Sequence, residues 1–353
     1  MTGGTLMITL ENYIDDLVQI VSADLPWEKL RDVSVLITGG TGLIGSCLTD
    51  ALILANRKYR LGLRLILMVR GKERAMQRFA GNDEIITYLV QDVCTPLSDD
   101  VNADYIVNCA SNAHPKLYAA EPVGTILTNV LGMNNLLEYS ARHGVKRVLE
   151  LSSVEIYGEN RGDTERFDES YCGALDCSTY RSGYPESKRV CEALCHSYAA
   201  QYGVDCVIAR LSRCYGPTMN MSDSKASAQF IKNALAGEDI VLRSSGKQRY
   251  SYLYMADAVS GILTVLLKGQ SGEAYNMADE LSDITLGGFA QAAAQAGGTK
   301  VVYDIPESME GYSGAVISLM CGDKLKALGW KALNSISIGV SKTVSQRQQQ
   351  PAS

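Results

Sequence analysis

The stretch that decides the fold is SVLITGGTGLIGSCLTDALILA, residues 34–55. The apolar run at 34–40 predicts a buried strand, and residues 41–55 have the pattern of the helix that follows it. Between them, TGGTGLIG (38–45) spaces three glycines three residues apart. Such a turn lets the backbone approach a pyrophosphate, whose charge then meets the helix N-terminus. This strand–turn–helix context predicts a dinucleotide-binding loop formed by Gly39, Gly42, Leu43, Ile44 and Gly45.

The alternation of strands and helices continues as far as residue 212. Short apolar runs predict further strands at 63–69, 86–93, 103–111, 145–153 and 204–212. Longer runs predict helices at 125–144, with Gly144 as the C-cap, and at 184–203. Strands that alternate with helices in this way predict an α/β fold built on a doubly wound parallel sheet.

Four segments are predicted from the change of pattern along the chain. They are a helical extension (1–32), the dinucleotide-binding domain (33–212), a smaller mixed lobe (213–340) of which some segments return to the first domain, and a disordered tail (341–353). In the extension, residues 10–22 have the spacing of an amphipathic helix that packs on the domain behind it or, alternatively, forms a dimer contact. Its apolar residues are Leu10, Tyr13, Ile14, Leu17, Val18 and Val21.

Composition excludes several classes of function. The 353 residues carry a net charge of −6 without a Lys/Arg block interleaved with aromatic residues, so nucleic acid is not an expected partner. No window approaches about 18 uncharged apolar residues, and the N-terminal residues lack a basic region, so neither a membrane span nor secretion is expected. Ten scattered cysteines fit reduced thiols in the cytoplasm. Cys191 and Cys195 share a helix face, but no second pair completes a zinc set, so no metal is expected.

The end of the second predicted strand bears on the choice of cofactor. An acidic residue there would bind the ribose 2′-hydroxyl of NAD, whereas an arginine favours the 2′-phosphate of NADP. The strand ends in LMVRGKER, with Arg70 at this position and Lys72 and Arg74 behind it. The pattern leans toward NADP and leaves NAD open; a solvated basic loop is the other interpretation. Asp92, after the third strand, is placed to accept from the adenine amino group or to serve as a turn residue.

The motif YPESK places Tyr184 and Lys188 four residues apart on one helix, so their side chains share a face. A tyrosine must lose its proton to act as a base, and its reference pKa is about 10. Lowering that pKa by roughly three units needs about 4 kcal/mol, much of which a neighbouring ammonium supplies in a partly dry site. Lys188 is also a candidate to hold the nicotinamide ribose. The preceding strand ends in Ser152 and Ser153, whose hydroxyls are placed to bond the same substrate oxygen as Tyr184.

In this combination the motifs resemble the extended short-chain dehydrogenase/reductase family, specifically its nucleotide-sugar epimerase/dehydratase branch. The resemblance covers roughly residues 33–335 and rests on TGGTGLIG, QDV, NCAS, SSVEIYG, YPESKR, RLSRCYGPTM, RYSYLYMADAV, AYNMADE and DKLKALGWK, in this order. It implies a Rossmann domain that holds NAD(P) and a smaller lobe that binds a nucleoside-diphosphate sugar. In such enzymes the tyrosine base and the cofactor oxidise a sugar hydroxyl, usually at C4. The ketone then acidifies C5 or labilises a carboxylate, and the hydride returns.

The resemblance also implies roles for individual residues. By motif position, Ser153, Tyr184 and Lys188 carry the oxidation. Asn129 matches a structural asparagine near the active site. The implied cofactor-binding residues beyond the glycine loop and Arg70 are Asp92, Val93, Ala110, Ser111, Asn129, Tyr184 and Lys188.

The segment SSVEIYG discriminates between branches of this family. It has Glu155 two residues before Tyr157, and a carboxylate at the end of an apolar strand costs free energy unless it is paired, protonated or used. Dehydratases and UDP-glucuronate decarboxylases resemble the chain in having Glu there, which favours a lyase over a 4-epimerase. Val154 stands where dTDP-glucose 4,6-dehydratases carry an Asp acid, which disfavours that dehydratase. The resemblance implies that Glu155 is a catalytic residue that serves the step after the oxidation; a Glu155 that turns to solvent is the alternative interpretation.

Two departures from the family pattern concern the substrate. The arginine that grips substrate phosphate or carboxylate in the family falls at Tyr250, and a family asparagine falls at Arg213. The hypothesis is that Arg213, or Arg249 after a shift of one residue, supplies the missing charge, since a guanidinium pairs two anionic oxygens at once. The alternative is that the two changes are unrelated and the anion is held weakly.

The expected partner is therefore a nucleoside-diphosphate sugar, and the helices at 125–140 and 184–200 are candidates for a homodimer interface. Three other functions remain open. They are a 4-epimerase, an NADPH-dependent reductase of the same superfamily and a non-catalytic dinucleotide-sensing protein.

Overall fold

The computed structural model of the chain describes residues 11–113, 115–305 and 317–348. Its largest sheet has seven strands: β1 (Ser34–Thr38), β2 (Arg64–Val69), β3 (Ile86–Val90), β4 (Tyr105–Asn108), β5 (Arg147–Ser153), β6 (Cys206–Leu211) and β10 (Ala274–Met277). Their order is β10-β6-β5-β4-β1-β2-β3, and every neighbouring pair is parallel. The order runs outward from β1 in both directions, so the sheet is doubly wound and the predicted fold class is confirmed.

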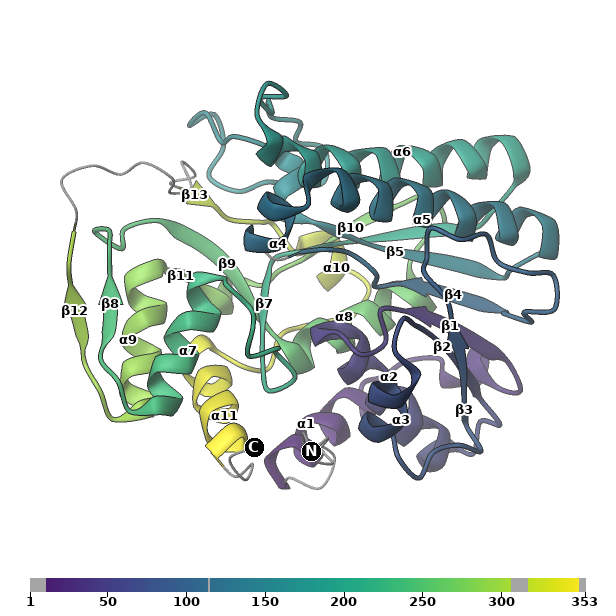
Figure 1. Ribbon diagram of the computed structural model, residues 1–353, viewed down its shortest axis with the longest axis horizontal. Coiled ribbons are helices and arrows are strands. Elements are labelled where there is room, and N and C mark those ends of the chain that lie inside the picture. The colour runs from purple at the N-terminus through teal and green to yellow at the C-terminus, as the bar shows by residue number, and fades with distance from the viewer. Residues whose placement is uncertain (1–10, 114, 306–316, 349–353) are drawn as a thin grey trace.

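Helices cover both faces of this sheet (Figure 1). They are α1 (Glu11–Val21), α2 (Leu43–Tyr59), α3 (Lys72–Arg78), α4 (Pro115–Ala120), α5 (Pro122–His143), α6 (Gly183–Tyr202) and α8 (Met255–Lys268). Helices α5 and α6 lie side by side on one face, and α1, α2 and α8 pack together on the other. Leu36 of β1 packs in the core beneath α5 and α6, whereas Val35 and Ile37 pack beneath α2 and α8. Both faces of the sheet are therefore buried, as the continuous apolar runs predict.

A smaller mixed lobe lies beside the large sheet (Figure 1). Its elements are β7 (Arg213–Tyr215), α7 (Ala226–Ala236), β8 (Ile240–Leu242), β9 (Arg249–Tyr254), β11 (Asp283–Thr285), α9 (Leu286–Gly297), β12 (Val301–Tyr303), β13 (Ile317–Ser318) and α11 (Ile336–Gln348). Helix α10 (Asp323–Lys326) returns to the large sheet, where it contacts β10 and α8. Strand β9 pairs with β7, β11 and β13, and β8 pairs separately with β12. Short 3-10 helices complete the described chain: η2 (Trp27–Leu30), η3 (Val154–Tyr157), η4 (Tyr180–Ser182) and η5 (Glu280–Ser282).

Helix α1 joins the two lobes. Its inner residues Tyr13, Leu17, Ile20 and Val21 are buried, whereas Ile14 and Val18 of the predicted apolar stripe are exposed. Leu10 lies outside the described residues. On the buried side, the Asp16 carboxylate accepts from Tyr254 of β9 and from Lys342 and Gln346 of α11, which belong to the smaller lobe. The Tyr13 hydroxyl donates to Asp50 of α2 at 2.6 Å.

The prediction of a disordered tail from residue 341 is wrong as far as residue 348, because α11 continues to Gln348. Val340 and Val344 are buried on one side of this helix, and Gln346 donates to Asp16 at 3.0 Å. Arg347 donates to the carbonyl oxygen of Pro217 at 2.9 Å. These contacts stabilise a polar helix whose sequence alone resembles a solvated tail. Residues 349–353 lie outside the described part of the chain.

All ten cysteines carry free thiols. Over the residues that the structure describes, no three His, Cys, Asp or Glu side chains are grouped closely enough to hold a metal ion. In the same ranges, no helix combines the length and the apolar character needed to cross a bilayer.

Candidate active site

The glycine-rich loop connects β1 to α2, which begins at Leu43 with Gly42 as its N-cap. Gly39 has a φ of +62°, and a Cβ atom there would lie 2.8 Å from the carbonyl oxygen of Cys109. A Cβ atom on Gly45 would collide with the carbonyl oxygen of Gly39. A side chain at either position would displace backbone, which explains why the loop needs glycine. The close packing leaves the N-terminus of α2 open to an anionic ligand.

A cleft beside this loop gathers most of the predicted cofactor residues: Gly39, Gly42, Arg70, Asp92, Val93, Ala110 and Ser111. Arg74 and Asn112 line the same cleft. The Ser111 hydroxyl is buried without a hydrogen-bond partner among the described residues, so a polar ligand group would satisfy it. The glycine cradle, the helix N-terminus and this hydroxyl together fit a dinucleotide.

Four predicted cofactor residues need a separate description. Leu43 and Ile44 form the first turn of α2 and do not line the cleft. Asn129 is buried on α5, where its Nδ2 donates to Ser187 Oγ at 2.8 Å and its Oδ1 has no partner within the described ranges. Asp92 lines the cleft, and its Oδ1 also accepts from the N–H of Cys94 at 2.9 Å. Asp92 is thus a turn residue that also faces the cleft.

The Tyr–Lys pair lies near the start of α6, with both side chains buried. Tyr184 forms a side-chain hydrogen bond with Ser153, the last residue of β5. Lys188 Nζ donates to the carbonyl oxygen of Leu151 at 2.6 Å and to Glu150 Oε1 at 2.8 Å. The structure therefore brings the three residues that are predicted to carry the oxidation together at the end of β5, next to the buried carboxylate of Glu150.

The electrostatics of Tyr184 differ from the sequence-based expectation. Burial raises the pKa of its hydroxyl above the usual value, and the opposing effect of Lys188 does not overcome this. The carboxylates of Glu155 and Glu150 raise the pKa of Tyr184 further. Lys188 does act to lower this pKa, as expected, but burial has the larger effect, so the expected net lowering is wrong for the protein alone.

Glu155 lies in η3, where its N–H donates to Ser153 Oγ at 3.2 Å. Burial raises the pKa of its carboxyl, and the cations Arg213 and Lys225 oppose that shift. Glu155 in turn raises the pKa of Tyr184. The residue is half-buried and its side chain acts on the charged groups of the site, which disfavours the alternative in which it turns fully to solvent.

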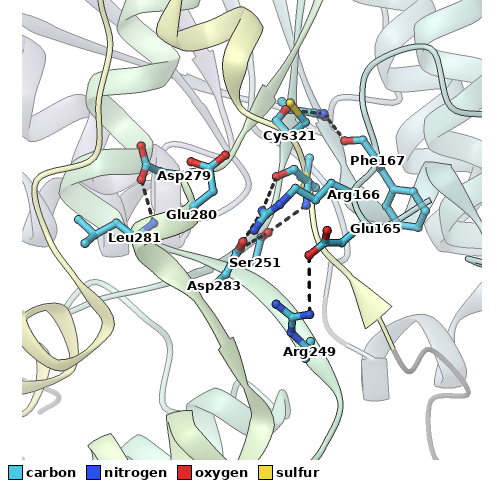
Figure 2. Close-up of polar contacts among 12 residues, drawn as sticks. Glu165, Arg166, Phe167, Arg249, Ser251, Asp279, Glu280, Leu281, Asp283 and Cys321 are labelled. Atoms are coloured by element: carbon cyan, nitrogen blue, oxygen red, sulfur yellow. Dashed lines mark hydrogen bonds and ion pairs between the residues drawn. The ribbon is translucent and has the colours of Figure 1, made fainter. Parts of the chain in front are cut away.

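Of the two candidate arginines, the structure places Arg213 in the site. Its guanidinium lies 3.9 Å from the centre of the Tyr250 ring, so the two positions that depart from the family pattern are in contact. Successive residues of a strand point to opposite faces, and Arg249 accordingly points away from Tyr250. Figure 2 shows Arg249 beside Glu165, 4.0 Å away, next to the Arg166–Asp283 ion pair.

Three residues around the Tyr184–Lys188 pair and Glu155 belong to none of the predicted sets. Glu150 accepts a hydrogen bond from Lys188. It could have been found from the sequence, because an acidic residue inside an apolar strand indicates a buried, paired carboxylate. The Tyr118 ring stacks on that of Tyr184 with centres 5.5 Å apart. Lys225, at the N-cap of α7, acts to lower the pKa of the Glu155 carboxyl. Only the fold brings Tyr118 and Lys225 to the site, because both lie far from Tyr184 in sequence.

The doubly wound sheet, the glycine loop and the buried Ser–Tyr–Lys set define an extended short-chain dehydrogenase/reductase fold. The model of the NAD dependent epimerase/dehydratase family matches residues 35–278. The chain belongs to this family, and its cofactor class is therefore NAD.

The chain is similar in sequence to several UDP-glucuronic acid decarboxylases. The chain is 34% identical over 234 residues to UDP-glucuronic acid decarboxylase 1 of Xenopus tropicalis, a match that covers 66% of this chain and 53% of the relative. It is 35% identical over 243 residues to UDP-glucuronic acid decarboxylase 6 of Arabidopsis thaliana, covering 68% of each protein. The chain thus spans about half the length of the first of these relatives.

Solved structures show the same fold. The dTDP-glucose 4,6-dehydratase DesIV of Streptomyces venezuelae, solved with NAD, superposes with a TM-score of 0.76 at 24% identity, covering 90% of this chain and 97% of that one. The UDP-glucose 4-epimerase of Thermotoga maritima, solved with UDP-glucose, gives a TM-score of 0.76 at 23% identity, with 90% and 99% covered. At these identities the likeness concerns the fold alone.

Proposed function

We propose that the protein oxidises the sugar of a nucleoside-diphosphate sugar at C4 and then decarboxylates it, with UDP-glucuronic acid as the substrate to test first. The observation that carries the proposal is the half-buried Glu155 beside the Ser153–Tyr184 hydrogen bond. A 4-epimerase needs no second acid or base at this point, because its ketone only rotates. The names of the curated relatives support the choice of substrate.

In the proposed reaction, Tyr184 accepts the proton of the C4 hydroxyl, and Ser153 bonds the same oxygen. When bound, NAD would supply hydride transfer from and back to the sugar, and Lys188 would hold its nicotinamide ribose. A C4 ketone lies β to the C5 carboxylate, so carbon dioxide can leave with its bonding electrons delocalised into an enolate. The C5 carbon then needs a proton. Glu155 is placed to hold that proton, because burial raises the pKa of its carboxyl.

Incubation of the purified protein with a panel of nucleotide sugars, including UDP-glucuronic acid, tests the proposal. Mass spectrometry of the products should show the loss of carbon dioxide from UDP-glucuronic acid. A product lighter by water would indicate a dehydratase, and an unchanged mass with altered stereochemistry would indicate a 4-epimerase. Net consumption of NADPH would indicate a reductase, and no conversion of any sugar would leave a dinucleotide-sensing protein.

Replacement of Arg213 by Met is expected to raise the KM for the nucleotide sugar by about ten- to a hundredfold, with a smaller effect on kcat. The reason is that a charged hydrogen bond to an anion contributes about 1.5–3 kcal/mol. Steady-state kinetics measure the change, and Arg249→Met is the matched control, since Arg249 pairs with Glu165 on the other face of β9. Equal effects of the two substitutions would contradict the assignment.

We further propose that the cleft admits NADP as well as NAD. Arg70 follows β2 and lines the cleft with Arg74, where both can meet a 2′-phosphate. Arg70→Ala is expected to weaken NADP binding about tenfold and NAD binding less than twofold, as measured by calorimetry. Lys72→Ala is the control, since Lys72 does not line the cleft. An equal loss of affinity for NAD and NADP would show that Arg70 does not bind the 2′-phosphate.

We also propose that the protein forms a homodimer through α5 and α6. Val123, Ile126, Leu127 and Leu131 of α5 and Val190 of α6 are exposed although they are apolar. The two helices lie side by side on the outer face of the sheet, so these residues can meet the same surface of a second copy (Figure 1). Light scattering tests the proposal, and a mass of one chain at micromolar concentration would contradict it.

A further inference from the structure

Glu150 is a fully buried carboxylate in the middle of β5, within the seven-stranded sheet. Its Oε1 accepts from Lys188 Nζ at 2.8 Å, and its Oε2 accepts from Asn108 Nδ2 at 2.6 Å. An ammonium and an amide NH₂ can only donate, so the arrangement suits an ionised carboxylate. An unpaired charge in this position would be strongly destabilising, so Glu150 and Lys188 depend on each other.

The hydrogen bonds continue across the sheet toward the glycine loop. Asn108 Oδ1 accepts from Thr38 Oγ1 at 2.7 Å, and Thr38 Oγ1 accepts from the N–H groups of Cys109 and Ala110 at 3.0 Å. Thr38 and Asn108 are register partners on β1 and β4, and Asn108 and Glu150 are register partners on β4 and β5. Three adjacent strands thus present one continuous polar row, which ends at Lys188 of α6.

Lys188 has three N–H donors, and acceptors among the described residues take two of them. Glu150 takes one and the carbonyl oxygen of Leu151 takes another, which fixes the direction of the third. We propose that Glu150 is a positioning residue for the reaction: it holds Lys188 so that its remaining N–H donor faces the cofactor side of the site. This inference rests on the proposed function, in which Lys188 binds the nicotinamide ribose.

The charges of Glu150 and Lys188 support a role in positioning Lys188 rather than in lowering the pKa of Tyr184. Lys188 lowers the pKa of Tyr184, whereas Glu150 raises it, so the two charges act on Tyr184 in opposite directions. Other groups around the pair are the thiols of Cys109 and Cys191 and the carboxylate of Glu192, which itself pairs with Arg210. What the pair supplies to the site is therefore mainly a fixed hydrogen-bond donor.

A double-mutant cycle tests this inference. Glu150→Gln is expected to lower kcat by on the order of a hundredfold with KM for the sugar nearly unchanged, as a misplaced catalytic group does. In a Lys188→Met background the same substitution should change kcat less than twofold, because Glu150 acts only through Lys188. Fully additive losses, or a folded Glu150→Gln variant with wild-type kcat, would overturn the proposal. Glu192→Gln is the control, a second buried carboxylate of an ion pair, expected to keep kcat within twofold.

Cofactor binding supplies a readout that does not depend on turnover. The Kd for NAD should rise by the same factor in Glu150→Gln, in Lys188→Met and in the double variant; unequal rises would overturn the proposal. If Glu150→Gln does not fold, Glu150→Asp keeps the charge but shortens its reach, and kcat is still expected to fall, whereas wild-type kcat would overturn the idea. A wild-type protein that binds NAD but converts no sugar would refute the proposed function, while the binding cycle would still test Glu150.

Discussion

Replacement of Tyr184 by Phe is expected to lower kcat by on the order of 10³- to 10⁴-fold while NAD binding is retained. The substitution removes the hydroxyl that accepts the C4 proton and keeps the ring that stacks on Tyr118. General base catalysis by a positioned side chain contributes about 10²–10⁴-fold, and the bond from Ser153 to the same oxygen is lost as well. Single-turnover oxidation of UDP-glucuronic acid and calorimetry with NAD measure the two effects.

Tyr198→Phe is the control for this prediction, because Tyr198 lies on the same helix and its hydroxyl bonds Asn134 away from the site. Its kcat should stay within about twofold of the wild type. The pH dependence gives a second check. Tyr184 acts in its deprotonated form, and its pKa lies above the usual value, so wild-type kcat is expected to rise as pH rises through the neutral range. A Tyr184→Phe variant that keeps a tenth of the activity would remove Tyr184 from its assigned role.

Replacement of Glu155 by Gln is expected to spare the first oxidation and to lower product formation by about 10²- to 10³-fold. An amide keeps the shape of the side chain but cannot hold the proton that C5 requires. The variant should therefore accumulate reduced cofactor after one oxidation, visible as near-ultraviolet absorbance, whereas the wild type returns the hydride. Mass spectrometry of the nucleotide sugar would show whether the decarboxylated product is released.

The matched control is Glu159→Gln, four residues further along and exposed to solvent. It should leave both steps within twofold of the wild type. A Glu155→Gln variant in which oxidation and product formation fall by the same factor would show that Glu155 supports the geometry of the whole site. Full product formation by this variant would instead assign the C5 proton to another group.

The local patterns predict the fold well because the inner strands of the large sheet are buried on both faces and consist mostly of apolar residues. The glycine loop is predictable for a related reason, since Gly39 and Gly45 sit where a Cβ atom would meet backbone. Helix α11 is the opposite case. Its polar sequence has little helical preference of its own, and the contact with Asp16 that stabilises it comes from the other end of the chain.

The candidate site likewise combines features that local sequence predicts with features that depend on contacts between distant parts of the chain. Spacing on one helix predicts that Tyr184 and Lys188 meet, because i and i+4 positions share a face. Spacing cannot predict the direction in which the pKa of Tyr184 shifts, because that depends first on how deeply the fold buries the hydroxyl and then on the carboxylates that other elements bring near it. The choice between Arg213 and Arg249 likewise depends on which face of β9 carries Tyr250, and a one-residue difference in register reverses it.

Helix α1 has a practical consequence for anyone who shortens this protein. Sequence motifs alone suggest that a fragment starting near residue 33 would hold the whole catalytic unit. Such a fragment would lack Asp16, the shared acceptor for Tyr254, Lys342 and Gln346, and would uncover the apolar surface that Leu17 and Ile20 protect. Expression clones, tag-cleavage sites and fusion junctions are therefore best placed ahead of α1.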